Sequence, residues 1–476
     1  MQHRAFKINA NFQSDLLLIF IYNRKVRLTY SRTLMLISKN KKNSTILLIE
    51  KIIAIAVAFL SGVYIARVAG ASVFGEYTYI LSLVGLFSPL CVMGLNNITT
   101  QYVVKYPKNE HTFLMLILII RGAGAFASLF IGVAIIAMFV DSQSMAISMM
   151  QLLALQCLQL FYAIEFFFLA KQKVVISSVI RVIALLVSSL LKILCVYWQS
   201  SIEMLVLAHG LSYVIVSLGY LIHYRKHAKQ RRYMFRFRRA HFKRMLSLFH
   251  KGKWLLMSGF AAVIYLKIDQ IMLGQLKSVQ EVGHYAAAAR LSEFWYVFPI
   301  LIANAYSSHL FKLHQQDRDK FQQFILLFLS ALIAISLLIS ITVTLLSPFI
   351  IDIIFGSEYA PSAAVLSIHI FATIFIFQRA VLSKWLIATK LYQMSLFTHG
   401  FGAVTNVLLN ILFIPKWGII GAAWATVVSY MFASYVSLFF SAKTRPFAHL
   451  MTSAMLLFPW KLYQYRQQSA RQQETL

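Results

Sequence analysis

Charged side chains, and acidic ones above all, are scarce in this chain. Only 13% of its 476 residues are charged, whereas 59% are hydrophobic. A soluble globular domain carries about 25% charged residues, so this composition excludes that class and indicates an integral membrane protein. Lysine and arginine outnumber aspartate and glutamate by 45 to 15. The basic excess lies in loops and no basic module of a nucleic-acid-binding type occurs, so we expect no nucleic acid among the partners.

Several kinds of chemical site are also missing from the sequence. Cys91, Cys157 and Cys195 stand singly in apolar runs, which predicts core residues and not disulfides or metal ligands. The chain has no Walker A loop and no HExxH spacing of histidines. The acidic pair in segment 317–319 resembles a sugar-transferase DxD motif but lies in a short loop without a nucleotide-binding domain. We therefore expect a protein that is not an enzyme and has no cofactor and no metal.

The chain consists largely of long apolar runs. A helix needs about 20 apolar residues to cross a bilayer, so the runs predict an all-α polytopic membrane protein with about 12 transmembrane helices. A further run, 447–460, is shorter and predicts an interfacial helix. The twelve long runs are 46–68, 76–97, 112–140, 145–169, 174–197, 203–223, 253–274, 284–307, 322–346, 362–388, 392–414 and 418–440.

Basic residues mark alternate loops between these runs. The largest loop, 224–252, is rich in lysine and arginine and has no acid. The positive-inside rule therefore places this loop and both termini in the cytoplasm. The same loop separates two blocks of six spans. The predicted order is a basic N-terminal segment 1–45, an N-lobe 46–223, a linker 224–252, a C-lobe 253–440 and a cytoplasmic tail 441–476.

The two blocks share a short pattern at matching places. Gly75 and Tyr77 open the second span of the first block, and Gly283 and Tyr285 open the second span of the other. An even number of spans per block makes this a parallel repeat, which predicts a central cavity between the lobes as the substrate path. Residues 1–34 fit neither block, and Met35 precedes the first true span. We interpret 1–34 as a disordered extension or an upstream start.

Basic side chains inside the apolar runs are the strongest functional signal. A cation at the centre of a bilayer costs at least about 2.5–3.5 kcal/mol, so these residues are expected to face a cavity or a partner. Far fewer acids share these runs, and the ones that matter here are Glu165, Asp269 and Glu293. A net positive interior predicts an anionic cargo. The basic residues are Arg67, Arg121, Arg181, Lys192, Lys267, Arg290 and Arg379.

Depth separates the candidates. We expect Arg67, Lys267 and Arg290 to line the cavity and bind phosphate, because the guanidinium fork matches phosphate oxygens. Arg121 and Arg379 would extend that surface. Lys192 lies near an outer end, where it can reach the headgroups, and Arg181 has no evident partner. Glu165 and Lys384, near inner ends, are interpreted as bystanders.

The acids leave alternatives open. Arg290 and Glu293 are three residues apart on one helix and can pair locally. Asp269 can instead pair with Arg290 across two spans. Asp269 is also the best candidate for a carboxylate that couples transport to a proton or another ion, since burial and nearby cations act on its charge in opposite directions.

Several segments together resemble the O-antigen flippases (Wzx or RfbX-like) of the multidrug/oligosaccharidyl-lipid/polysaccharide exporter superfamily. The resemblance covers roughly residues 35–445 and rests on the order and spacing of the segments. They read EKIIAIAVAFLSGVYIARVAGASVFGEYTYILSLVGLFSPLCVMGLNN, YLKIDQIMLGQ, VGHYAAAARLSEFWYVFP, SPFIIDIIFGSEYAPSAAVL and IPKWGIIGAAWATVVSY.

This resemblance implies two six-helix lobes around a V-shaped cavity and export of an undecaprenyl-diphosphate-linked oligosaccharide, an O-antigen or similar repeat unit, across the bacterial inner membrane by alternating access. It implies membrane lipids, a polysaccharide polymerase and chain-length machinery as partners. The cavity helices of the family carry over to Arg67, Lys267, Asp269 and Arg290. Three alternatives remain: a multidrug exporter, a peptidoglycan-precursor flippase, and a membrane polymerase or ligase.

Overall fold

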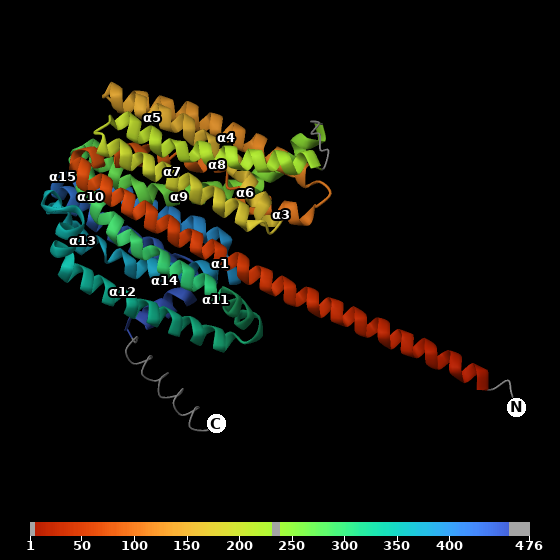
Figure 1. Cartoon of the computed structure of the whole chain (residues 1–476). Coiled ribbons are helices and arrows are strands. Elements are labelled where there is room, and N and C mark those ends of the chain that lie inside the picture. The colour runs from red at the N-terminus through yellow and green to blue at the C-terminus, as the bar shows by residue number, and fades with distance from the viewer. Residues whose placement is uncertain (1–4, 231–238, 457–476) are drawn as a thin grey trace.

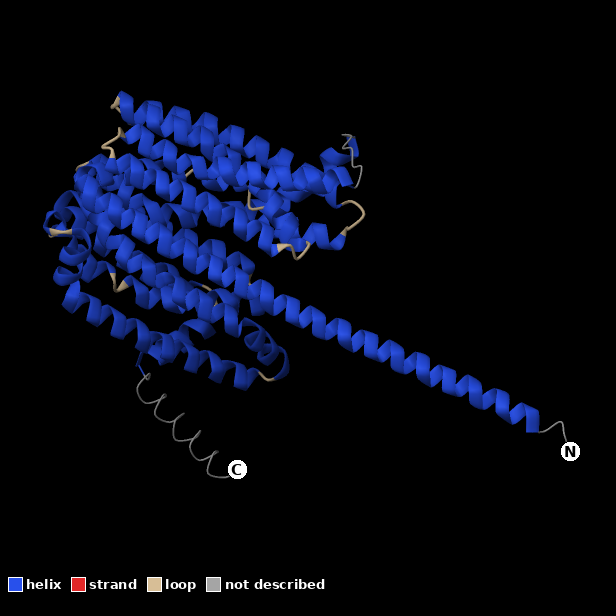
Figure 2. Ribbon diagram, viewed as in Figure 1, coloured by secondary structure: helices blue, strands red, loops and turns tan. Residues whose placement is uncertain are grey.

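In a computed structural model that describes residues 5–230 and 239–456, every regular element of the described chain is helical (Figure 2). The first part contains α1 (Ala5–Gly85), α2 (Ser88–Val92), α3 (Asn96–Lys105), α4 (Glu110–Phe139), α5 (Gln143–Gln156), η1 (Cys157–Tyr162), α6 (Ala163–Ala170), α7 (Val174–Tyr197) and α8 (Ile202–Gln230). The second part contains α9 (Arg239–Leu276), α10 (Val279–Glu293), η2 (Phe294–Tyr296), α11 (Val297–Gln316), α12 (Arg318–Phe355), η3 (Ser357–Tyr359), α13 (Pro361–His369), α14 (Ala372–Ala388), α15 (Tyr392–Ser434) and η4 (Val436–Phe440).

Two glycines turn long helices back on themselves. Within the described residues, ten helical segments are long and apolar enough to cross a membrane. Two of these, in α1 and α15, each join two helices at a residue with non-helical torsion angles, Gly70 (φ 81°) and Gly418 (φ 54°). Positive φ is accessible to glycine without steric cost. The ten segments therefore make twelve crossings, which confirms the predicted all-α membrane protein of about 12 transmembrane helices.

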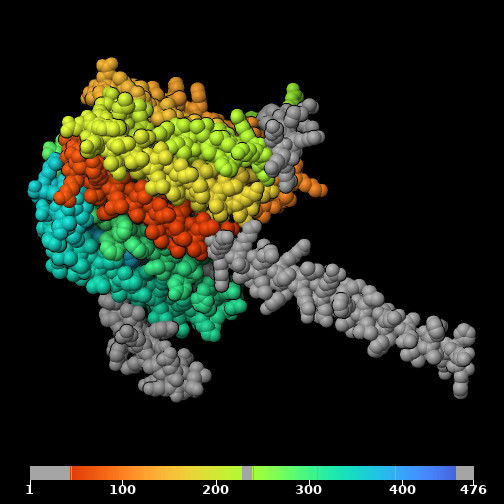
Figure 3. Space-filling view, in the orientation of Figure 1, coloured from red at the N-terminus to blue at the C-terminus, as the bar shows by residue number. Residues whose placement is uncertain are grey.

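The helices form two groups on either side of α1. In Figure 1, α4, α5, α7 and α8 lie on one side of α1, and α11, α12 and α14 lie on the other. We call α1 to α8 the N-lobe and α9 to α15 the C-lobe. The helix α1 packs against α7 of its own lobe and against α10 of the other. Figure 3 shows the surface of α1 lying between the rest of the N-lobe and the C-lobe.

The lobes meet closely at the end of the bundle away from the basic loops, which we call the outer end. Hydrogen bonds join Ala71 N to Glu358 Oε1 (2.7 Å) and Tyr359 Oη to Ala66 O (2.9 Å). The glycines of the two matching motifs face each other here. A Cβ at Gly75 would lie 1.8 Å from the carbonyl oxygen of Val279, and one at Gly283 would lie 2.0 Å from that of Ala71. Absence of side chains is what lets the two backbones touch.

The segments at the ends and in the middle differ from the sequence-based expectation. Residues 1–34 were interpreted as a disordered extension or an upstream start, and the described part of them, 5–34, continues α1 back to Ala5 beyond the bundle (Figure 1). The reason is that no proline or glycine precedes Gly62. The predicted linker 224–252 is helical where it is described, as parts of α8 and α9, and residues 231–238 lie outside the described residues.

The helix predicted to lie at the membrane interface, 447–460, packs against protein in its described part. Residues 445–456 are helical, and 457–460 lie outside the described residues. Phe447, Ala448, Met451 and Ala454 are buried against the C-lobe, where the ring of Phe447 lies 5.1 Å from that of Trp385. Because its apolar face is already covered by protein, this helix docks on the bundle and does not depend on a membrane surface to bury that face.

We predict that Gly75→Ala lowers the melting temperature of the purified protein. The new methyl group would overlap the backbone of α10, and overpacking of this kind costs about 1–3 kcal/mol. The matched control is Gly85→Ala in the same helix, where a Cβ meets nothing within 4 Å and helix propensity slightly favours alanine. Equal melting temperatures for the two variants in detergent would show that the close approach of α1 and α10 is not required.

Candidate substrate and ion site

Arg290 reaches from α10 of the C-lobe to the surface of the N-lobe. Its Cζ lies 5.3 Å from the ring centroid of Phe74 on α1. A Cβ at Gly62 would lie only 1.3 Å from Nη1 of Arg290, so glycine makes room for the guanidinium. Nη1 is buried and has no hydrogen-bond partner in the described structure. A buried donor without a partner is costly, so this group is suited to receive a ligand.

A cavity of about 230 Å³ adjoins this guanidinium between the lobes. Ile55, Ala58 and Phe59 of α1 line one side, and Arg290 and Glu293 belong to the other. Phe59 extends the lining further, with its ring 5.6 Å from that of Phe294. The location between α1 and α10 is the one expected for a path between two lobes.

Neither ion pair that the sequence left open for Arg290 is formed. The ion pairs of the described residues involve other side chains. Glu293 lines the same cavity and lies within electrostatic range of Lys267 and Arg290. Asp269 takes hydrogen bonds from uncharged partners instead. The positive charge of Arg290 is therefore not neutralised by a contacting carboxylate.

Lys192 belongs to this basic interior, contrary to its expected place at the outer headgroups. Only 8% of its surface is exposed, and it lies within electrostatic range of Arg290 and His209. Tyr77 and His209 share a hydrogen bond, with 3.0 Å between Oη of Tyr77 and Nδ1 of His209. Residues four apart share a helix face, and Ser188 and Lys192 are both buried on one face of α7. This polar stripe is the sequence signal that could have identified Lys192 as an interior residue.

Asp269 lies in a compact polar cluster of the C-lobe. The residue is 3% exposed and its carboxylate accepts hydrogen bonds from Tyr285 Oη (2.8 Å), Asn410 Nδ2 (2.5 Å) and Thr426 Oγ1 (2.5 Å). Asn406 lies one turn from Asn410, with 3.3 Å between Nδ2 of Asn410 and its Oδ1. The donors come from α10 and from both halves of α15, so the Gly418 reversal is what assembles the cluster.

Oxygen atoms in this cluster suit a hard cation. Oδ1 of Asn410 is buried without a hydrogen-bond partner in the described structure. The hydroxyl of Thr426 also reaches the carbonyl oxygen of Ala422 (2.9 Å). A carboxylate, an amide oxygen, a hydroxyl and a carbonyl are typical ligands of hard cations, and the carboxylate alone can hold a proton.

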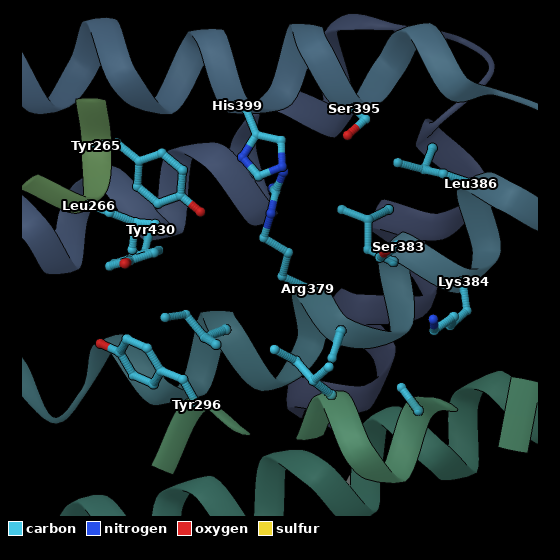
Figure 4. Close-up of a pocket in the computed structure, with 15 residues that line it drawn as sticks. Tyr265, Leu266, Tyr296, Arg379, Ser383, Lys384, Leu386, Ser395, His399 and Tyr430 are labelled. Carbon is cyan, nitrogen blue, oxygen red and sulfur yellow. The ribbon is translucent and has the colours of Figure 1, made fainter. Parts of the chain in front are cut away.

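A larger cavity, of about 360 Å³, lies inside the C-lobe around Arg379 (Figure 4). Arg379 extends from α14 toward His399, and donates to Ala433 O (2.9 Å) and Thr398 Oγ1 (3.2 Å). Tyr265, one helical turn before Asp269 on α9, also lines it. The hydroxyl of Tyr296, another lining residue, is buried without a partner in the described structure. Aromatic faces beside a cation and unpaired polar atoms suit a polar ligand such as a sugar phosphate.

The remaining predicted cations lie elsewhere. Arg67 is exposed at the outer end, where its Nη1 donates to Ile353 O (2.7 Å) across the lobes. Arg121 is fully buried inside the N-lobe and donates to Asn96 Oδ1. Lys267 is partly buried, and Glu293 is its electrostatic neighbour. The structure therefore brings Lys267 and Arg290 to one region and places Arg67, Arg121 and Arg379 at three others.

Arg181, which had no evident partner, contacts two acids. It forms ion pairs with Glu50 on α1 and Glu165 on α6, and its Nε lies 2.8 Å from Oε1 of Glu50. Ser178 also donates to Glu50 (3.1 Å). Glu165 is thus a partner and not a bystander. Arg181 and Glu165 lie far from Glu50 along the chain, which is why sequence spacing did not reveal this triad.

Two protein families and a glycan flippase match parts of this sequence. Residues 41–306 match the family described as polysaccharide biosynthesis protein, and residues 255–412 match the MatE family. A probable low-salt glycan biosynthesis flippase from Haloferax volcanii is 28% identical over 212 residues, which cover 42% of this chain and 44% of that protein. The match thus spans less than half the length of that relative.

Two solved structures share the fold. A lipid II flippase in an inward closed conformation superposes with a TM-score of 0.65 at 16% identity, covering 86% of this chain and 90% of that one. An inward-facing multidrug resistance transporter of the MATE family in the MOP superfamily superposes with a TM-score of 0.63 at 14% identity, covering 83% and 95%. At these identities the likeness establishes the fold alone.

We predict that Arg181→Ala strongly destabilises the protein, because it leaves the carboxylates of Glu50 and Glu165 without their cation. Removing one partner of a fully buried ion pair costs about 3–5 kcal/mol, which is the upper limit for these partly buried side chains. The control is Lys320→Ala, which breaks an exposed pair with Asp317 worth about 0–1 kcal/mol. Thermal melting of both variants in detergent tests this, and a decrease for Arg181→Ala no larger than that for the control would contradict it.

Proposed function

This chain belongs to the polysaccharide biosynthesis protein family, and on that premise we propose that it is a flippase for undecaprenyl-diphosphate-linked oligosaccharides, such as O-antigen or a similar repeat unit. The observation that carries the proposal is the buried Arg290 guanidinium, whose Nη1 has no hydrogen-bond partner and which adjoins a cavity between the lobes. The membrane in question would be the bacterial inner membrane, with both termini in the cytoplasm.

Charge supports a diphosphate as the group recognised. Arg290 lies within electrostatic range of Lys192, and both Arg290 and Lys267 lie within range of Glu293, which is also within range of Asp269. The three cations of this region therefore outnumber its two acids. A diphosphate supplies the negative charge that this region lacks, and arginine binds its oxygens through two parallel N–H bonds. The lipid tail would stay in the bilayer while the headgroup occupies the space between the lobes.

The closed outer end indicates which step this conformation represents. Contacts of Ala71 with Glu358 and of Tyr359 with Ala66 hold the lobes together there. The headgroup would enter from the side of the basic loops, and separation of α1 from α10 at the Gly75 and Gly283 contact would release it outward. Alternating access of this kind moves one lobe against the other around a fixed site.

Asp269 would couple this motion to an ion gradient. Tyr285, which donates to Asp269, lies on α10 only five residues before Arg290. A proton or a hard cation at the carboxylate would compete with the hydrogen bond from Tyr285 and so act on the helix that carries Arg290. Coupling then needs no other connection than the rigid helix between the two residues.

A peptidoglycan-precursor flippase is the second candidate, because the same basic region suits any lipid-linked diphosphate glycan. A multidrug exporter of the same fold fits less well, since cationic drugs would meet Arg290 and Lys192. A polymerase or ligase also fits less well, because a long outward loop with reactive residues would be expected and the outward loops of the sequence are short. A polysaccharide polymerase and its chain-length machinery would instead act on the exported product.

We predict that Arg290→Ala strongly reduces transport while the protein is still expressed and folded. A hydrogen bond to a charged group contributes about 1.5–3 kcal/mol, so the loss should be about ten- to hundredfold. Arg290→Lys keeps the charge without the fork and should retain part of the activity. The assay uses proteoliposomes that contain undecaprenyl-diphosphate oligosaccharide, and measures how fast headgroups become accessible to an added glycosidase.

The control for this experiment is Lys416→Ala, which removes an exposed cation at the outer end and should leave transport unchanged. If Arg290→Ala transports at the wild-type rate, the phosphate role is wrong. If undecaprenyl-diphosphate disaccharide-pentapeptide is transported and O-antigen units are not, the second candidate replaces the first.

We predict that Asp269→Asn uncouples transport from ion gradients. Asparagine keeps the shape of the cluster but cannot carry the charge that a proton or cation neutralises. Proteoliposomes with imposed proton or sodium gradients should therefore transport faster with wild-type protein, and at one constant rate with Asp269→Asn. Asp141→Asn, at an exposed position, should respond like the wild type. A variant that loses Asp269 and keeps its gradient response would refute the coupling role.

A further inference from the structure

A second cluster of ionisable side chains lies in the N-lobe, at the end that carries the basic loops. Glu110 and His111 begin α4, and His227 lies near the end of α8. One ligand atom from each, a carboxylate oxygen and two imidazole nitrogens, all lie within 4.8 Å of one another. These residues take no part in the transport path described above.

We propose that Glu110, His111 and His227 form a binding site for a divalent transition metal, with Zn²⁺ the best match. Two imidazoles and one carboxylate are a common protein ligand set for zinc, with a water molecule as the fourth ligand. With zinc to nitrogen and oxygen bonds of about 2.0–2.2 Å, tetrahedral geometry places ligand atoms roughly 3.3–3.6 Å apart. Nε2 of His111 already lies 3.7 Å from Oε1 of Glu110, and the other separations, at most 4.8 Å, have to contract by up to about 1.5 Å.

The surroundings orient His111 for metal binding. Its Nδ1 lies 3.0 Å from the hydroxyl oxygen of Tyr224 on α8. When Nδ1 carries the proton that it donates to this oxygen, Nε2 presents its lone pair, and Nε2 faces Glu110 with 3.7 Å to Oε1. Metal-bound histidines almost always use their second nitrogen in this way. Tyr224 is thus a positioning residue for the site.

The cluster is also enclosed. Glu110 is 1% exposed and His111 6%. The ring of Phe167 on α6 lies 5.6 Å from the ring of His111 and 5.6 Å from that of His227. A hydrophobic wall limits access of water and strengthens the attraction between a carboxylate and a cation. This separates the cluster from a chance group of exposed acids.

Lys171 would compete with a metal ion for the carboxylate of Glu110. Its ammonium group forms an ion pair with Oε2 of Glu110, and about a quarter of the lysine side chain is exposed. Lys171 can therefore turn to solvent when a metal ion binds. This competition gives a specific consequence: removal of the lysine charge should strengthen metal binding, whereas removal of any ligand should weaken it.

A metal here would join the start of α4 to the end of α8, beside α6. The start of α4, the end of α6 through Phe167, and the end of α8 converge on the cluster. The helix α8 is the last of the N-lobe, so the ion would fix the place from which the chain leaves toward the C-lobe. The proposal is independent of the transported substrate, because it concerns stability and geometry at this end of the N-lobe.

The test measures zinc on the full chain purified in detergent. Chelator-treated protein is incubated with Zn²⁺, washed, and its metal content is determined by mass spectrometry together with its melting temperature. Wild-type protein should retain zinc in a stoichiometric amount and melt at a higher temperature with zinc than without. His227→Ala and Glu110→Gln should lose the bound zinc and the shift. Lys171→Met should bind zinc more tightly than the wild type.

The matched control is His223→Ala. His223 lies one turn before His227 on α8, is exposed, and contacts the carbonyl oxygen of Gly219 through Nδ1 (2.9 Å). This variant should bind zinc like the wild type. The proposal is overturned if wild-type protein retains no zinc, or if His223→Ala and His227→Ala lose it equally. If His227→Ala does not fold, His227→Gln and the Lys171→Met affinity decide, and weaker binding by Lys171→Met overturns the proposal.

Discussion

The cost of an unpaired charge away from water is the constraint on which this structure depends. Every basic side chain in the apolar spans has to find an acceptor, an acid or water. Arg181 has Glu50 and Glu165, Arg379 has the carbonyl of Ala433, and Arg67 has that of Ile353. Arg121 and Arg290 each keep buried guanidinium nitrogens without a hydrogen-bond partner in the described structure, and Arg290 differs from the others because it also lines a cavity between the lobes. The same rule that assigns a structural role to the first three assigns a ligand to Arg290.

The contact between α1 and α10 combines close backbone packing with the buried charge of Arg290. The absence of side chains at Gly75 and Gly283 lets the two helices touch at the outer end, and the absence of one at Gly62 leaves space for the guanidinium of Arg290 further along the same contact. A movement that separates these helices therefore changes both the outer closure and the surroundings of the charge. Asp269 is tied to the same helix by Tyr285, so ion binding, closure and the basic region share one element.

Much of the fold and part of the site could be predicted from residues alone. Apolar runs of about 20 residues predict spanning helices because a helix satisfies its backbone hydrogen bonds within one segment, and ten helical segments with two glycine reversals agree with that count. The burial of Asp269 follows from its place in a long apolar run. The helix at residues 5–34 was missed because the segment fits neither block of spans, although it contains no helix breaker.

The sequence by itself determined the class of molecule, the number of crossings and the sign of the interior charge, because each depends on residue type and local order. Tertiary structure alone decided which charges are paired. Arg181 and Glu50 are far apart in the chain, Lys192 turns inward and not to the headgroups, and His227 comes to Glu110 and His111 only when α8 packs beside α4. Side-chain partners in a helical bundle come from the packing of whole helices, and spacing along one helix contains no information about its neighbours.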